Sequence, residues 1–162
     1  MADTMAKANQ LVLTDGGTGW NKLQSVFGLA RSLGGTEGLA WAIQGGVALA
    51  TAAALVVRWR SDAPYDLKAA ALAVGTVLVT PYAFAYDLVV LAVPVAFLLR
   101  FGLARGFMRF DGLALAATGA LLLSYIVATT QVGLAASLVV ALVIAWRVWD
   151  CASAAMAPST TT

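Results

Sequence analysis

The residues best suited to chemistry lie in one short run that follows a proline. Tyr82, Tyr86 and Asp87 come soon after Pro81, and their neighbours are apolar. An acid beside hydrocarbon is costly, so Asp87 suggests contact with a substrate, an ion or a proton, although an aspartate before Leu-Val-Val is also an ordinary helix N-cap. The two tyrosines could stack on a sugar or hydrogen-bond a phosphate, or they could simply lie at a membrane interface.

A second group of polar residues lies nearer the N-terminus, in the segment from Trp20 to Leu33. Its apolar side on a helical wheel holds Trp20, Leu23, Val26, Phe27, Ala30 and Leu33. Its polar side holds Asn21, Gln24, Ser25, Arg31 and Ser32. This separation predicts an interfacial amphipathic helix that lies along the membrane surface. Gln24 and Arg31 could bind an anionic lipid head, or the polar side could simply face water.

The amino-acid inventory limits the chemistry that these residues can perform. The 162-residue chain has no histidine, and Cys151 is its single cysteine, which excludes a structural zinc site, a Cys-His nucleophile pair and an internal disulfide. We therefore expect no metal and no cofactor, and we assign no catalytic residue. The net charge is only +2, and the basic residues are spread along the chain, which argues against a nucleic-acid partner.

The elements that must position these residues are long apolar runs. The chain is 61% hydrophobic and 11% charged, whereas a typical soluble domain is about 25% charged. The clearest run is Gly38 to Val57, twenty residues without a charge, which is enough to cross a hydrocarbon core of ~30 Å. Thr36 and Glu37 precede it as an N-cap and a first-turn acid, and Gly34 breaks the chain before them.

Two further runs are each too long for one span and contain a polar break. Pro81 divides the run 69–99 into helices two and three, and the patch 129–133 divides the 35 uncharged residues between Asp111 and Arg147 into helices four and five. Helices two and three are each slightly short, so a re-entrant pair is the alternative. The sequence therefore predicts an all-α integral membrane protein with about five transmembrane helices plus an N-terminal interfacial amphipathic helix.

The expected organisation has four parts. Residues 1–19 form a flexible N-terminal tail, 20–35 the interfacial amphipathic helix, 36–150 the transmembrane helical bundle and 151–162 a disordered C-terminal tail. No apolar core of a cleavable secretory signal is visible in the first twenty residues, so the helices themselves must drive insertion.

Basic residues are concentrated in alternate loops. The loop between helices one and two contains Arg58, Arg60 and Lys68, and the loop between helices three and four contains Arg100, Arg105 and Arg109. Because cytoplasmic loops carry an excess of lysine and arginine, we expect these loops inside and the loops 82–86 and 129–133 outside. The amphipathic segment then lies on the outer side, together with the turn at Pro81.

Four segments carry a resemblance to a known family. They are Trp20 to Phe27 (WNKLQSVF), Leu33 to Gly35 (LGG), Asp66 to Ala70 (DLKAA) and Thr80 to Leu88 (TPYAFAYDL). Together they resemble the C-terminal half of glycosyltransferase family 87, over about residues 20–110 and more weakly to about residue 150. That family comprises polytopic bacterial membrane enzymes of the GT-C architecture. Ala85 is a departure, because members often have a second acid at this position.

The resemblance implies a mannosyltransferase-like hexosyltransferase that takes its sugar from a polyprenyl phosphate on the outer side of a bacterial inner (plasma) membrane. It also implies that the site is incomplete, because the acid thought to serve as catalytic base lies in the N-terminal half of such enzymes. We therefore expect a C-terminal fragment that carries part of the donor-side scaffold. The substrate-binding candidates are Tyr82, Tyr86, Asp87, Gln24 and Arg31.

The expected partners are membrane lipids, the polyprenyl-phosphate sugar, and the missing N-terminal half or another membrane protein. The alternative is a small non-catalytic membrane subunit that packs against another complex through its glycine- and alanine-rich helices. A transporter is a third and weaker hypothesis, because the spans offer one acid and no basic partner at the middle of the membrane.

Overall fold

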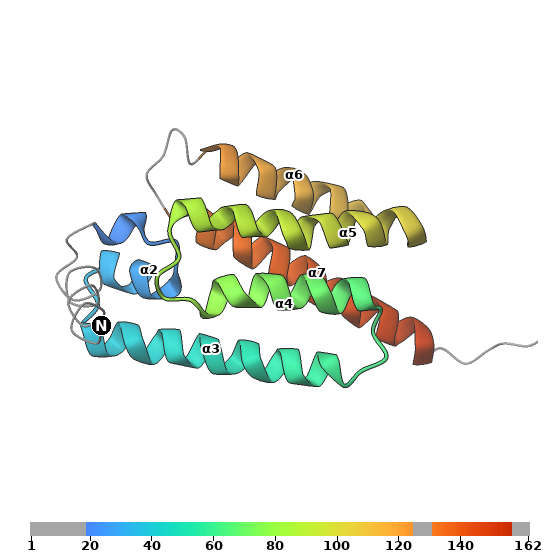
Figure 1. Ribbon diagram of the computed structural model, residues 1–162, viewed down its shortest axis with the longest axis horizontal. Helices are drawn as coiled ribbons and strands as arrows, with labels where there is room; N and C mark the ends of the chain where they lie inside the picture. Colours follow the sequence, from blue (N-terminus) through green and yellow to red (C-terminus); the bar gives the residue numbers. More distant parts are fainter. Residues whose placement is uncertain (1–18, 125–130, 157–162) are drawn as a thin grey trace, which may run out of the picture.

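The chain forms a bundle of helices in the computed structural model, which describes residues 19–124 and 131–156. The elements of this part of the chain are η2 (Trp20–Lys22), α2 (Val26–Ser32), α3 (Glu37–Trp59), α4 (Tyr65–Val79), η3 (Ala85–Leu91), α5 (Ala92–Arg105), α6 (Arg109–Ser124) and α7 (Val132–Met156). Figure 1 shows α3 to α7 running side by side, with α2 at the end of the bundle where α3 begins. The expected all-α membrane architecture is confirmed.

Local signals in the sequence set the bounds of α3. The side chain of Thr36 accepts a hydrogen bond from the backbone N–H of Leu39 (3.3 Å), as an N-cap does, and Glu37 lies in the first turn. Before it, Gly34 adopts a φ of 84°, a conformation that ends α2 at little cost only in glycine. The helix ends at Trp59, within the basic run expected to terminate it.

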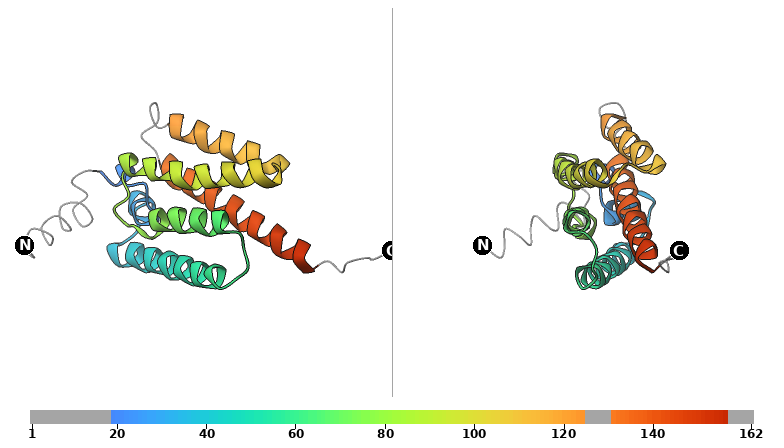
Figure 2. Two further views of the ribbon diagram at one scale, coloured as in Figure 1. Left: turned by 45° about the vertical axis from the view of Figure 1, so that its right-hand side comes forward. Right: turned by 90° about the vertical axis from the view of Figure 1, so that its right-hand side faces the viewer.

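The central helix of the bundle is α4, which packs against α3, α5 and α7, while α6 packs against α7 (Figure 2). The core between these helices is made of aliphatic and aromatic side chains: Leu67, Ala70, Val74, Leu91, Leu98, Phe101, Ala136, Val140 and Ile144. Small residues on α4 allow close helix approach, since a Cβ on Gly75 would lie 3.0 Å from Leu55 Cδ1.

Three helices of the described chain are long and apolar enough to cross a membrane. They are Glu37–Trp59, Ala85–Arg105, which joins η3 to α5, and Val132–Cys151. With 15 and 16 residues, α4 and α6 are shorter than the ~20 residues that a full span requires. Five parallel helical segments are therefore present, and the number of spans stays a prediction.

The two ends of the bundle differ in the residues they carry. We call one the turn end; it contains α2, the start of α3 and the chain between α4 and η3 (Figure 1). We call the other the basic end; it contains the loops that follow α3 and α5. The basic residues there are Arg58, Arg60, Lys68, Arg100 and Arg105. The two basic loops thus share one end, as expected, and the turn at Pro81 lies at the other. The side of the membrane that each end faces stays a prediction.

The expectation of one amphipathic helix over 20–33 is wrong. The segment contains η2, a short extended stretch and then α2, because tertiary hydrogen bonds replace helical ones in its middle. Leu23 forms an isolated antiparallel bridge with Phe84, and the N–H of Gln24 donates to the carbonyl oxygen of Ala83 (2.6 Å). The predicted polar and apolar sides of the segment also do not match its burial, since the polar Gln24 is 1% exposed and the apolar Leu33 is 78% exposed.

The C-terminal tail is shorter than expected. We predicted disorder over 151–162, but α7 continues to Met156. Residues 1–18 of the predicted flexible tail over 1–19 lie outside the described residues. Residues 157–162 of the predicted C-terminal tail lie outside them too, as do Thr129 and Thr130 of the polar patch.

Candidate functional site

Tyr82 and Asp87 line one hollow at the turn end of the bundle. The hollow has a volume of about 360 Å³ and lies between the last turns of α4 and the helix η3. Its other lining residues are Thr76, Val77, Thr80, Ala83 and Val90. Clefts of this size hold small-molecule ligands. The structure thus brings together two of the five expected substrate-binding residues.

Asp87 is held by the backbone of the turn. Its Oδ2 accepts a hydrogen bond from the N–H of Phe84 (2.9 Å), and its own N–H donates to the carbonyl oxygen of Phe84 (3.0 Å). The carboxylate therefore caps η3 by reaching back from the third helical position, rather than as the N-cap residue that the sequence suggested. Its second oxygen, Oδ1, makes no hydrogen bond within the described part of the chain.

The two tyrosines have different surroundings. Tyr82 is half-buried against the cluster formed by Leu23, Phe27 and Ala40, and desolvation by this burial raises the pKa of its phenol above the usual 10.0. Its hydroxyl therefore stays protonated at neutral pH. Tyr86 is 73% exposed, stacks on Phe84 with ring centroids 5.5 Å apart, and lies outside the hollow.

Gln24 holds the segment 20–35 against the start of α7. Its Oε1 accepts a hydrogen bond from the N–H of Gly133 (2.8 Å). A Cβ on Gly133 would clash with the side chain of Leu88, so only glycine allows this approach. Ser25 acts beside it: its hydroxyl donates to the carbonyl oxygen of Pro81 (2.7 Å) and accepts from the N–H of Gly28 (3.1 Å). Both polar side chains are buried, which corrects the expectation that their side of the segment faces water or lipid heads.

Arg31 contacts residues of its own segment, 20–35. Its Nη1 donates to the carbonyl oxygen of Gly35 (2.9 Å), and its guanidinium lies 4.3 Å from the centroid of the Trp20 ring, a cation–π geometry. Arg31 and Gln24 are not among the residues that line the hollow. Their substrate-binding role stays a prediction, and the contacts seen for them are structural.

Gln44 was missed by the sequence analysis, although it is a buried amide within the apolar run of α3. Its Oε1 accepts from the N–H of Phe27 (3.0 Å), and its Nε2 donates to the carbonyl oxygens of Leu78 (3.1 Å) and Val79 (3.0 Å). The signal was available, because a polar side chain within a membrane span usually finds a partner on another helix. Gln44 thereby ties α3 to α2 and to the end of α4, and this end of α4 forms one wall of the hollow.

A buried ion pair at the basic end was also missed. Arg147 donates from Nε to Asp111 Oδ1 (2.9 Å) and from Nη2 to Asp111 Oδ2 and to the carbonyl oxygen of Gly106 (3.0 Å). The sequence analysis used these two charges only as the bounds of an uncharged run. Because α6 and α7 pack together, and the stretches 111–124 and 132–147 are of similar length, the two ends of the run meet.

Thr76 and Thr80 were missed as well. They are spaced i, i+4 at the end of α4 and so share one face of the helix. Their hydroxyls donate to the carbonyl oxygens of Ala73 and Thr76, both at 2.7 Å. Since the hydroxyl protons are used in this way, the threonines present acceptor lone pairs to the hollow. Within the described residues, no cluster of three histidine, cysteine, aspartate or glutamate side chains is placed to hold a metal.

Comparison with known proteins identifies one family. The sequence model of glycosyltransferase family 87 matches residues 2–81. The match covers α2, α3 and α4 and stops at Pro81, so it includes one wall of the hollow but not Tyr82 or Asp87. No curated protein and no solved structure matches the chain. The match over residues 2–81, almost half of the chain, supports a glycosyltransferase family 87 domain.

Proposed function

We propose that the chain forms the sugar-binding side of a membrane hexosyltransferase that takes mannose or a related sugar from a polyprenyl phosphate. Its family supports the transferase activity. The observation that supports the site is that the phenol of Tyr82 and the carboxylate of Asp87 line one hollow at the turn end. In this proposal the chain is the C-terminal portion of such an enzyme, and its site works together with the N-terminal half.

The hollow suits the hydroxyls of a sugar better than a phosphate. It offers the free oxygen of Asp87 and the lone pairs of Thr76 and Thr80 as acceptors, and the neutral phenol of Tyr82 as a donor. Lysine and arginine are absent from the described residues that line it, and a carboxylate repels a phosphate. The groups that hold the donor phosphate must therefore come from elsewhere, which supports a site shared with another part of the enzyme.

The same inventory limits catalysis by this chain. A lipid-phosphate sugar is already activated, so transfer needs a positioned acid or base near the acceptor hydroxyl and groups that hold the phosphate. Asp87 provides at most one such acid or base, which is worth about 10²–10⁴ in rate, whereas enzymes reach about 10⁶ or more. Asp87 is therefore expected to matter only when the phosphate-binding half is present.

Binding to proteoliposomes tests the sugar site without requiring catalysis. The full chain is reconstituted, and retention of radiolabelled polyprenyl-phosphate mannose is compared with retention of the polyprenyl phosphate alone. Asp87→Asn and Tyr82→Phe should weaken retention of the sugar form several-fold and leave the sugar-free form unchanged. Matched controls are Asp62→Asn and Tyr65→Phe, since both residues are exposed at the opposite end. Equal behaviour of the two pairs would contradict the site.

A transfer assay tests the division of labour. The chain alone should release no mannosyl product, whereas co-reconstitution with the N-terminal half of a family member should give transfer that Asp87→Asn abolishes. Transfer by the isolated chain would refute the shared site. If the Asp87→Asn variant still gave full transfer, the role of Asp87 would be only to cap η3. That result would favour the alternative hypothesis, in which the chain is a non-catalytic membrane subunit.

A further inference from the structure

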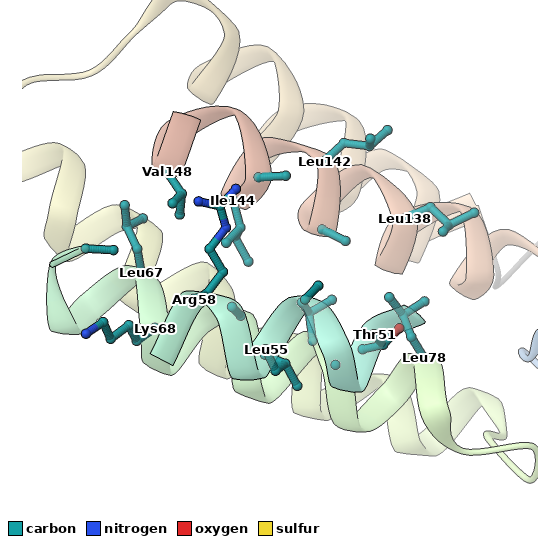
Figure 3. A pocket seen from close by; sticks show the side chains of 17 residues that line it. Thr51, Leu55, Arg58, Leu67, Lys68, Leu78, Leu138, Leu142, Ile144 and Val148 are labelled. Carbon is teal, nitrogen blue, oxygen red and sulfur yellow. The ribbon is translucent and has the colours of Figure 1, made fainter. Parts of the chain in front are cut away.

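A groove on the other side of the central helix has no role in the proposed reaction. It has a volume of about 330 Å³ and lies between α3, α4 and α7. Figure 3 shows its apolar walls, formed by Leu55, Leu67, Leu78, Leu138, Leu142 and Ile144, and the side chain of Arg58 extending across from α3 toward α7.

Two cations lie at one end of this groove. Arg58 and Lys68 line it at the basic end, opposite the sugar hollow. Lys68 Nζ donates to the carbonyl oxygen of Trp59 (3.2 Å), and within the described chain the guanidinium of Arg58 makes no hydrogen bond or ion pair. None of the described residues that line the groove is acidic.

The acids nearest in the fold do not neutralise these cations. Asp66 pairs with Arg100 (3.7 Å), and the carboxylate of Asp111 is bound by Arg147. Asp62 and Asp150 are exposed and form no ion pair within the described chain. The cationic end of the groove is therefore complementary to an anion.

The length of the groove matches one leaflet of a membrane. Its lining on α4 extends from Leu67 to Leu78, a separation of eleven residues, which is ~16 Å at the helical rise of 1.5 Å per residue. Half of a hydrocarbon core of ~30 Å is close to this length. An apolar groove of this length with cations at one end has the dimensions and the charge pattern of a phospholipid.

We infer that the groove binds one anionic phospholipid, with an acyl chain between α3 and α7 and the phosphate at the mouth formed by Arg58 and Lys68. The bound lipid fills the space between these two helices and covers apolar side chains of both. This site is separate from the sugar hollow, and the inference does not depend on the proposed transferase activity.

Native mass spectrometry of the purified, delipidated full chain in a non-ionic detergent tests the charge requirement. Phosphatidylglycerol and phosphatidylcholine with identical acyl chains are titrated, and one tight phosphatidylglycerol is expected per chain. Arg58→Gln combined with Lys68→Gln should lower phosphatidylglycerol affinity about 10- to 30-fold, toward that of phosphatidylcholine. The matched control Arg60→Gln combined with Arg105→Gln changes two exposed cations outside the groove and should have little effect.

A second pair of measurements tests the chain-binding part of the groove. Ala141→Phe fills the groove and should weaken both lipids, and soluble glycerophosphoglycerol should not compete, since it lacks acyl chains. Arg58→Lys keeps the charge and should retain binding, and thermal unfolding confirms that each variant is folded. Equal affinity for the two lipids, an equal loss in the control pair, an unaffected Ala141→Phe or full competition by the soluble headgroup would each overturn the inference. Asp87→Asn should leave lipid binding unchanged, so the experiments distinguish a wrong sugar-site proposal from a wrong lipid-site inference.

Discussion

Replacing Gln44 by leucine should release the segment 20–35 from the rest of the bundle. The two side chains are of similar size, so the change removes the amide and leaves the packing volume nearly intact. Three hydrogen bonds are lost, to the N–H of Phe27 and to the carbonyl oxygens of Leu78 and Val79. Each is worth about 0.5–1.5 kcal/mol, and the buried groups that remain lose their partners. We expect a loss of about 2–4 kcal/mol in the free energy that keeps the segment docked.

Amide hydrogen exchange measures this loss directly. Because 1.4 kcal/mol corresponds to a factor of ten, the peptide that covers 26–33 should exchange about 30- to 700-fold faster in Gln44→Leu. The matched control is Ile43→Ala at the neighbouring position. It removes apolar side-chain atoms but no hydrogen bond, and the Ile43 side chain is 41% exposed. Exchange that is unchanged in Gln44→Leu, or equally accelerated in Ile43→Ala, would refute the idea that this amide holds the segment.

Three further outcomes are expected. Asp111→Ala leaves Arg147 buried and unpaired and should cost about 3–5 kcal/mol in chemical unfolding, whereas replacing both residues by leucine and methionine should restore most of that stability; equal stability of the single and double variants would contradict the pair. On a cysteine-free background, single cysteines at Tyr86 and Arg105 should react with an impermeant maleimide from opposite sides of the membrane, and labelling from one side only would contradict the assignment of the bundle ends. The raised pKa of Tyr82 means that burial favours the neutral phenol, so this contribution to stability is present below pH 10.0 and is lost as the pH rises through the folded pKa. Tyr82→Phe should remove a phenol that ionises above pH 10.0 in an absorbance titration, and an unchanged curve would disprove this.

Features that depend on neighbouring residues in the chain were predictable from the sequence. The bounds of α3 follow from Thr36, from an uncharged run of sufficient length and from the arginine that ends it, all within one helix. The turn after α4 follows from Pro81 in the same way, and it places Tyr82 and Asp87 near one another because they are close in sequence. Two of the four polar residues that line the hollow were therefore predicted without a structure.

Features that depend on distant partners were not predictable in this way. A helical wheel places Gln24 and Ser25 in water. In the structure they are buried because Gln24 binds the N–H of Gly133 and Ser25 binds the carbonyl oxygen of Pro81. These contacts join positions 56 and 109 residues apart. The wheel assumes that the segment satisfies its own backbone, whereas here the turn end of the bundle provides the partners.

The shortness of α4 sets how deep a ligand can reach. Its 15 residues rise ~22 Å, about a turn and a half less than a hydrocarbon core of ~30 Å. A lone helix of this length would thin the bilayer around it, but α4 packs against α3 and α7, which are both long enough to span. The hollow at Thr76, Thr80 and Tyr82 lies at this shortened end. With the turn end outermost, a sugar there would sit below the level of the headgroups, within reach of a carrier lipid that never leaves the membrane.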